Sequence, residues 1–314
     1  MPKTSGMTPM RILMRALALT GLLVFIVPAQ AAGPSADELN ALIDQLVKRK
    51  MNEIDSQMGV VINLSGRQRM LTQKMSKEML LIYLGVDAKQ NRINLGNSAI
   101  MFSDTLKGLM DGDKKLNLPP TTDKAIYKQL ELVRGLWQHF SQYVLSTLGG
   151  DIDRAFIERM AQENLPLLSE MNKAVYMYEK AAGADLKTLA PVVNLSGRQR
   201  MLSQKMTKEF LLIAVHVSED QNKDNLAGTV ALFDRTLKGL LDGDPGQRLP
   251  GTPEADIRAQ LGLVQARWND YRPLLEAADF SEAQVKQAAA LNLPLLKEMN
   301  AAVKMYEVLS DGGG

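Results

Sequence analysis

Hydrophobic residues recur every three or four positions along most of the chain, which is the spacing of one face of an α-helix. Glycine and proline interrupt this pattern at corresponding places in the two halves of the chain. In the first half the pattern predicts four helices, at residues 37–84, 91–110, 123–148 and 152–180. We therefore expect an all-α fold made of two tandem antiparallel four-helix bundles with long first helices.

The two halves are copies of one unit. The stretch NLSGRQRMLTQKMSKEMLLI at 63–82 returns as NLSGRQRMLSQKMTKEFLLI at 194–213, with seventeen of twenty positions identical. Later segments match at offsets of 131 and 128 residues. Two long copies predict two similar domains, 32–182 and 183–314. A linker at 181–191 joins them, and the alternative is a kinked helix running from one copy into the next.

The repeated helix has two unlike faces. One face is the predicted bundle core, formed by Leu64, Gln68, Leu71, Met75, Met79 and Ile82. The opposite face lacks the lysine and glutamate of a solvated surface, and carries instead Ile62, Gly66, Arg69, Gln73 and Leu80. Glycine inside a helix costs about 0.5–1 kcal/mol relative to alanine. Close approach of another helix or of a ligand would compensate for that cost.

Packing the first helices of the two copies about a pseudo-twofold axis would bring Arg69 and Arg200 together. Two like charges that face each other are unfavourable unless an anion lies between them. The flat guanidinium can donate two parallel hydrogen bonds to a small planar oxyanion. The alternative is that both arginines are solvated or paired with carboxylates. The candidate site comprises Gly66, Arg69, Gly197 and Arg200, with Asn63, Gln73, Asn194 and Gln204 as further candidates.

The repeated motif Asn-Leu-Ser-Gly-Arg-Gln-Arg-Met-Leu-(Ser/Thr)-Gln-Lys-Met also resembles the PilJ-type N-terminal sensor domain of type IV pilus chemotaxis transducers and nitrate/nitrite sensor histidine kinases. The resemblance implies a periplasmic four-helix bundle. In nitrate-responsive members the motif's glycine and arginine hold the anion between the first helices of two subunits. The matching positions are Gly66, Arg69, Gly197 and Arg200, so one chain would build the site that its relatives build by dimerising.

The resemblance implies a periplasmic binding or sensory protein for a small oxyanion, nitrate or nitrite, which passes its state to a membrane receptor, kinase or transporter. The sequence shows no kinase or methyl-accepting output segment of its own. The alternative is a ligand-free helical module that docks on a membrane receptor or transporter.

Residues 1–31 have the order of a secretory signal peptide. Lys3, Arg11 and Arg15 precede a short apolar run at 16–27 and a small-x-small cleavage site at 29–31. The alternative is an uncleaved anchor in the inner membrane. Without this leader the formal charge falls from +2 to −1, which leaves no electrostatic footprint for nucleic acid.

The sequence contains few of the residues that catalytic and metal sites require. The chain has no cysteine and two histidines, so zinc sites and Ser-His or Cys-His nucleophiles are not expected. The Asp-Gly-Asp triplets at 111–113 and 242–244 lack the remaining ligands of a calcium loop and predict turns. We expect no enzyme activity, catalytic residue, metal or cofactor.

Overall fold

The computed structural model describes residues 36–182 and 189–312. The predicted leader and the middle of the join between the copies lie outside these residues. Within them the chain forms α-helices, one short 3-10 helix and two isolated β-bridges, without a strand. This confirms the all-α class and the two tandem bundles that the hydrophobic pattern predicts.

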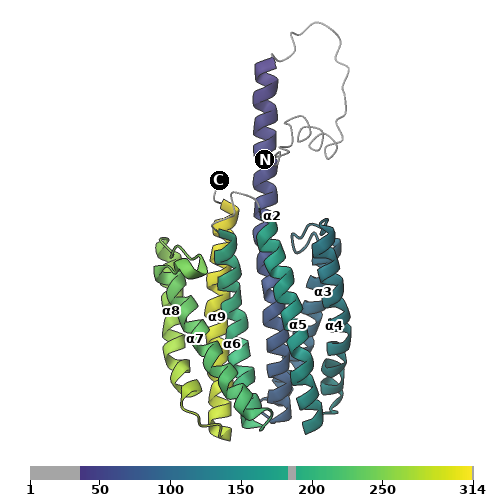
Figure 1. Ribbon diagram of the computed structural model, residues 1–314, viewed down its shortest axis with the longest axis vertical. Helices are drawn as coiled ribbons and strands as arrows, with labels where there is room; N and C mark the ends of the chain where they lie inside the picture. The colour runs from purple at the N-terminus through teal and green to yellow at the C-terminus, as the bar shows by residue number, and fades with distance from the viewer. Residues whose placement is uncertain (1–35, 183–188, 313–314) are drawn as a thin grey trace, which may run out of the picture. The chain divides into compact units, whose positions relative to one another are not determined.

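The first copy supplies α2 (Ala36–Tyr83), α3 (Ala88–Asp111), α4 (Lys124–Gly149) and α5 (Arg154–Ala181). The second copy supplies α6 (Leu189–Ala214), α7 (Glu219–Asp242), the 3-10 helix η1 (Pro245–Gln247), α8 (Ala255–Glu276) and α9 (Glu282–Gly312). Figure 1 shows the first copy running from purple through blue to teal and the second running on from teal-green to yellow. The described residues from Asp55 onward form one compact unit, which holds both copies of the repeated motif.

Each bundle buries the apolar stripes of its helices. In the second copy α6 packs against α7 and α9, while α8 packs against α7 and α9; in the first copy α4 packs against α3 and α5. Met75 and Met79 are fully buried, as the core face predicts. Trp137 and Trp268 lie in the two cores and donate their indole N–H to Ser103 Oγ and Asp234 Oδ1 respectively.

The helix boundaries fall within a few residues of those predicted. Asp123 caps α4 by accepting from the backbone N–H of residues 125 and 126. α5 ends at Ala181, since Ala182 has an extended backbone (φ −59°, ψ 138°). The alternative of a kinked helix through the join stays a prediction, because residues 183–188 lie outside the described residues. The predicted linker is too long at its far end, because α6 already begins at Leu189. Pro191 fits there, since proline is tolerated in the first turn of a helix.

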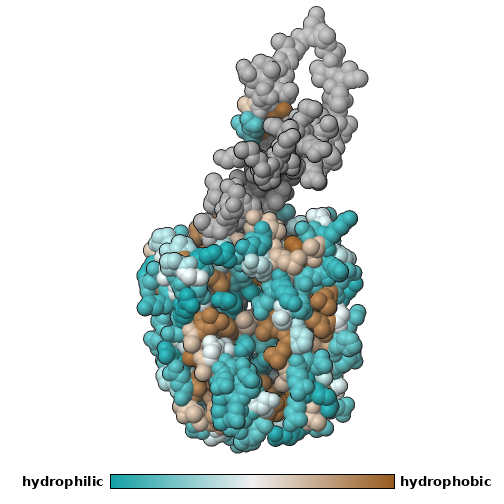
Figure 2. All heavy atoms as spheres, in the orientation of Figure 1, coloured by the Kyte–Doolittle hydropathy of each residue, from teal (hydrophilic) through white to brown (hydrophobic). Residues whose placement is uncertain are grey.

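The Asp-Gly-Asp triplets form turns, as expected. Gly112 and Gly243 adopt left-handed backbone conformations (φ 85° and 94°), and a β-bridge closes each turn, joining Asp113 to Leu118 and Asp244 to Leu249. The surface seen in Figure 2 is mostly hydrophilic, with hydrophobic side chains in scattered patches. In the parts of the chain that the structure describes, no helix has the length and hydropathy needed to cross a bilayer.

Candidate functional site

The repeated helix is buried on both of its faces. Along α2 from Gly59 to Ile82, and along α6 from Ala190 to Ile213, almost every side chain is inaccessible to solvent, polar ones included. Arg69 and Arg200 expose 3% and 4% of their surface. The alternative of solvated arginines is therefore wrong, because each motif helix lies between its own bundle and the other copy.

The two arginines meet across the copies through reciprocal hydrogen bonds. Arg69 Nη2 donates to the backbone oxygen of Asn194 at 3.1 Å and to its Oδ1 at 2.7 Å. Arg200 Nη2 donates to the same two atoms of Asn63, at 3.2 and 2.6 Å. This exchange is the pseudo-twofold arrangement expected for the first helices of two related copies.

The two motif glycines make room for the guanidinium groups. A Cβ atom placed on Gly66 would lie 3.2 Å from Arg69 Nη2 and 4.0 Å from Arg200 Nη2. One placed on Gly197 would lie 3.4 Å from Arg200 Nη2 and 3.8 Å from Arg69 Nη2. A side chain at either position would therefore meet both guanidinium groups, and the space that each glycine leaves for them offsets its helix-propensity cost.

The arginines carry charge that no carboxylate balances directly. Across residues 57–182 and 189–310 neither guanidinium forms a salt bridge, so the alternative of a paired arginine is also wrong for the described chain. The Nε–H group of each arginine is buried and has no partner among these residues. Burial, reinforced by neighbouring arginines, lowers the pKa of both Arg69 and Arg200 to about 9, although Glu179 opposes the shift at Arg69 and Glu307 opposes it at Arg200. Both arginines stay protonated at neutral pH. Two buried cations with spare donors are the setting in which an anion is stabilised.

The two motif asparagines connect the arginines to buried carboxylates. Asn194 Nδ2 donates to Glu179 on α5, and Asn63 Nδ2 donates to Glu307 on α9. Glu179 also pairs with Arg248, and Glu307 with Lys304, so both carboxylates already have a cationic partner. The site thus keeps an excess of positive charge at the axis.

Gln73 and Gln204 lie apart from the arginine contacts. They face helices α5 and α9, where Gln73 Nε2 donates to Asn164 Oδ1 at 2.8 Å and Gln204 Nε2 to Asn292 Oδ1 at 3.0 Å. The structure therefore joins six of the eight candidate residues in one network, the two glycines, two arginines and two asparagines. It places the two glutamines in a second polar layer further along the helices.

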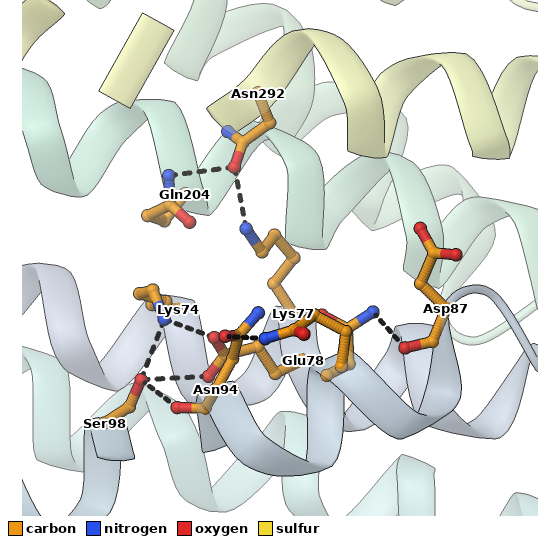
Figure 3. Close-up of polar contacts among 10 residues, drawn as sticks. Lys74, Lys77, Glu78, Asp87, Asn94, Ser98, Gln204 and Asn292 are labelled. Atoms are coloured by element: carbon orange, nitrogen blue, oxygen red, sulfur yellow. Dashed lines mark hydrogen bonds and ion pairs between the residues drawn. The ribbon is translucent and has the colours of Figure 1, made fainter. Parts of the chain in front are cut away.

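That second layer contains two buried lysines. Lys77 Nζ donates to Asn292 Oδ1 at 2.7 Å, and Lys208 Nζ donates to Asn164 Oδ1 at 3.2 Å, so each lysine reaches a helix of the other copy. Figure 3 shows Lys77 pointing to Asn292 beside Gln204. Burial lowers the pKa of both lysines to about 8.

A neighbouring ion pair lies inside each bundle. Lys74 bonds the carboxylate of Glu78, and Ser98 on α3 bonds both of them, as Figure 3 shows. Lys205 and Glu209 repeat this pair in the second copy. Burial raises the pKa of Glu78, while Lys74 and Lys77 oppose that rise. These pairs attach the motif helix to its own bundle, whereas Lys77 and Lys208 attach it to the other.

Sequence reasoning missed the lysines, the carboxylates and Asn164 with Asn292. Lys77 lies four residues beyond Gln73 on the same helix face, so its repetition in both copies was a usable signal. Asn164 lies two residues before Pro166, and both lie inside α5.

Two surface grooves lie away from this network. One of about 580 Å³ lies beside α7 and α8 in the second bundle and contains Arg272 and Phe280. Another of about 580 Å³ lies near Thr252 and Tyr306. Neither contains Arg69 or Arg200, which are enclosed by packed side chains. In the described residues no group of three or more histidine, aspartate or glutamate side chains is placed to hold a metal ion.

Comparison with known proteins agrees with this arrangement. Residues 51–159 and 184–293 match the PilJ family, described as the type IV pili methyl-accepting chemotaxis transducer N-terminal domain. The chain is also 29% identical over 121 residues to the methyl-accepting chemotaxis protein McpN of Pseudomonas aeruginosa. That match covers 38% of this chain and 22% of the relative, so the chain spans well under two thirds of the relative's length. Because the family matches cover more than half of the sequence, the chain belongs to the PilJ family and carries two tandem copies of its domain.

Proposed function

We propose that this chain is a periplasmic sensory protein that binds a small oxyanion, with nitrate and nitrite as the leading candidates, and passes its state to a membrane partner. Its role is binding rather than catalysis. The matches to chemotaxis transducers support a place in signal transduction.

The pair of buried arginines at the axis carries the proposal. Arg69 and Arg200 come from different copies, fill the space beside the same two glycines and form no salt bridge within the described residues. Burying a cation without a compensating partner costs several kcal/mol. An anion between them would remove this cost and would accept from the two Nε–H groups that have no partner.

The chemistry of the donors favours a small planar monoanion. Each guanidinium keeps a buried Nε–H without a partner, while its Nη2 already donates to two asparagine oxygens. A small planar oxyanion between the two arginines would accept from both Nε–H groups. Their enclosure by packed side chains disfavours a large or strongly hydrated ion, because such an ion loses more hydration on burial. Nitrate and nitrite meet both conditions better than sulfate.

Calorimetric titration of the purified chain with nitrate, nitrite, chlorate, sulfate and chloride tests the proposal. We expect saturable binding of one planar monoanion per chain. Arg69→Ala and Arg200→Ala should each abolish it while the helical content is kept. Arg134→Ala is the matched control, since Arg134 is exposed on α4 and pairs with Glu131, and it should bind as the wild type does. Unchanged affinity in both arginine variants would reject the site.

A second candidate function is a ligand-free docking module. The observation in its favour is the close packing at the axis, where the asparagine oxygens already occupy the arginine Nη2 groups and neither described groove reaches the arginines. Absence of binding to all five anions would favour this function. Capture of a membrane receptor or transporter by the immobilised chain would then be the next experiment.

A further inference from the structure

Two buried carboxylates outside the repeated motif hold the motif asparagines in one orientation. Glu179 on α5 and Glu307 on α9 are each more than nine-tenths buried. Each accepts a hydrogen bond from the Nδ2 of one asparagine, Glu179 from Asn194 and Glu307 from Asn63. The same asparagines accept from the arginines of the other copy. Two chains of contacts therefore run from a carboxylate through an amide to a guanidinium.

The chemistry of these groups fixes the amide in a single orientation. A carboxylate only accepts hydrogen bonds and a guanidinium only donates them, whereas an asparagine amide has one donating and one accepting end. The Nδ2 end must therefore face the glutamate, and the Oδ1 end must face the arginine. A rotated amide would place its N–H₂ group against the guanidinium and its oxygen against the carboxylate, which is unfavourable at both ends.

The orientation of the amide determines which arginine donors stay free. Asn194 offers its backbone oxygen and its Oδ1 to the same Nη2 of Arg69, so that nitrogen is held at two points. The Nε–H of Arg69 is left without a partner. Asn63 does the same for Arg200. Both guanidinium groups are thus fixed in place with an unused donor each.

We infer that Glu179 and Glu307 are positioning residues of the arginine site, and that each acts through one asparagine to hold the arginine of the opposite copy ready for an anion. Neither carboxylate touches the guanidinium that it orients. This inference rests on the proposed function, which it deepens by assigning two residues outside the motif to the same site.

The two carboxylates differ in their second contact, so the Glu179–Asn194–Arg69 chain of contacts and the Glu307–Asn63–Arg200 chain can be tested separately. Glu179 Oε1 accepts from Arg248, which follows η1 in the second copy. Glu307 pairs with Lys304 on its own helix, α9. Arg248→Ala should therefore disturb only the hydrogen bond between Glu179 and Asn194. Lys304→Ala should disturb only the one between Glu307 and Asn63.

A double-mutant cycle with nitrate as the probe tests the inference on the full chain. Glu179→Ala and Asn194→Ala should each weaken nitrate binding about tenfold, the size of one lost hydrogen bond to a charged group. The double variant should bind no more weakly than Asn194→Ala, because the carboxylate acts through the amide. Glu179→Gln should bind nitrate more tightly than Glu179→Ala, since its single amide oxygen can still accept from Asn194 Nδ2 as Glu179 Oε2 does.

Glu170→Ala is the matched control. Glu170 is another α5 carboxylate with a lysine partner, Lys173, but it contacts no motif asparagine. Its affinity for nitrate should equal that of the wild type. Independent losses that multiply in the Glu179→Ala/Asn194→Ala double variant would overturn the inference, as would unchanged affinity in both Glu179→Ala and Glu307→Ala.

A second measurement separates failure of this inference from failure of the proposed function. In ¹⁵N-labelled chain, Glu179→Gln or Glu179→Ala should shift the side-chain amide resonances of Asn194 and leave those of Asn63 in place. Glu307 variants should give the opposite pattern. If the wild type binds no nitrate but these shifts occur, the oxyanion proposal fails and the positioning contacts stand. If substitution of each glutamate leaves the amide resonances of its asparagine unchanged, the positioning role is rejected, whether or not nitrate binds.

Discussion

At Gly66, helix propensity favours alanine, whereas the space needed by the arginine site favours glycine. Alanine is favoured over glycine by about 1 kcal/mol inside a helix. A methyl group on Gly66 would, however, lie 3.2 Å from Arg69 Nη2 and would push that guanidinium by a few tenths of an ångström. We predict that Gly66→Ala keeps or raises the free energy of unfolding yet weakens nitrate binding at least tenfold, about 1.4 kcal/mol.

The control for Gly66→Ala is Gly96→Ala. Gly96 lies inside α3 with nothing within 4 Å of an added Cβ atom. This variant should gain about 1 kcal/mol in unfolding free energy and bind nitrate like the wild type. Denaturant unfolding and calorimetry on the two variants measure both quantities. Equal binding by the two glycine variants would show that the space at Gly66 does not shape the site.

Lys77 makes the stability of the chain depend on pH in the alkaline range. Burial lowers its folded-state pKa to about 8, while the unfolded chain keeps the ordinary value of 10.5. Between these values the unfolded state holds a proton that the folded state has released. Unfolding free energy therefore rises with pH in this window, by up to about 1.4 kcal/mol per pH unit for each such lysine.

We predict that Lys77→Met removes the part of this rise that is due to Lys77, while Lys208 keeps its own contribution. Urea unfolding at pH 7, 8, 9 and 10 should give a difference between wild type and variant that grows with pH in favour of the wild type. Below pH 8 the difference should be constant, because both states of the wild type are then protonated at Lys77. Lys173→Met, at an exposed lysine paired with Glu170, should follow the wild-type slope. Parallel slopes for Lys77→Met and the wild type would contradict the prediction.

At the scale of the element, α5 has a buried asparagine close to its proline. Pro166 removes one backbone N–H from the helix ladder. Two residues earlier, the buried Asn164 donates to the backbone oxygen of Thr72 at 3.0 Å and accepts from Gln73 and Lys208. α9 repeats this with Asn292. One asparagine per copy thus ties the fourth helix to both motif helices.

We predict that Asn164→Ala lowers the free energy of unfolding by about 2–4 kcal/mol, because it leaves the Lys208 ammonium buried without its acceptor. Denaturant unfolding monitored by circular dichroism measures this loss. The adjacent Leu165 is half exposed on the outer face of α5, so Leu165→Ala should stay within about 0.5 kcal/mol of the wild type. Equal losses in the two variants would mean that the asparagine contacts add little.

For the whole molecule, periodicity and repetition were enough to predict the fold and the pairing of the arginines. The face that both copies repeat is too poor in charged residues for a solvated surface, so it was expected to pack against the same face of the other copy. Gly66 and Arg69 indicated the point of closest approach. The contacts of the fourth helices could not be predicted in the same way. Glu179 is more than a hundred residues from Arg69, and a buried glutamate near a helix end looks like a surface one in sequence. Which residues a helix end meets depends on register and tilt, which periodicity does not specify.

The shared axis also predicts that the two copies unfold as one. Each copy holds one of the chain's two tryptophans, Trp137 or Trp268, and both are buried. In Trp268→Phe, fluorescence follows the first copy alone, and in Trp137→Phe it follows the second. Since α2 and α6 exchange buried hydrogen bonds in both directions, breaking one bundle removes partners from the other. We predict that, within each variant, the fluorescence transition coincides with the loss of helix seen by circular dichroism.

Nitrate should then raise the unfolding free energy measured from both tryptophan transitions by the same amount. A ligand at 100 times its dissociation constant stabilises a cooperative unit by about 2.7 kcal/mol. If the anion bridges Arg69 and Arg200, this gain belongs to both copies, and both tryptophans should report the same increase in unfolding free energy. An increase in only one of the two transitions would show that the copies unfold separately and that nitrate binds within a single bundle. Separate transitions without nitrate would show that the buried contacts between α2 and α6 are too weak to couple the bundles, and a one-chain anion site would then lose its structural basis.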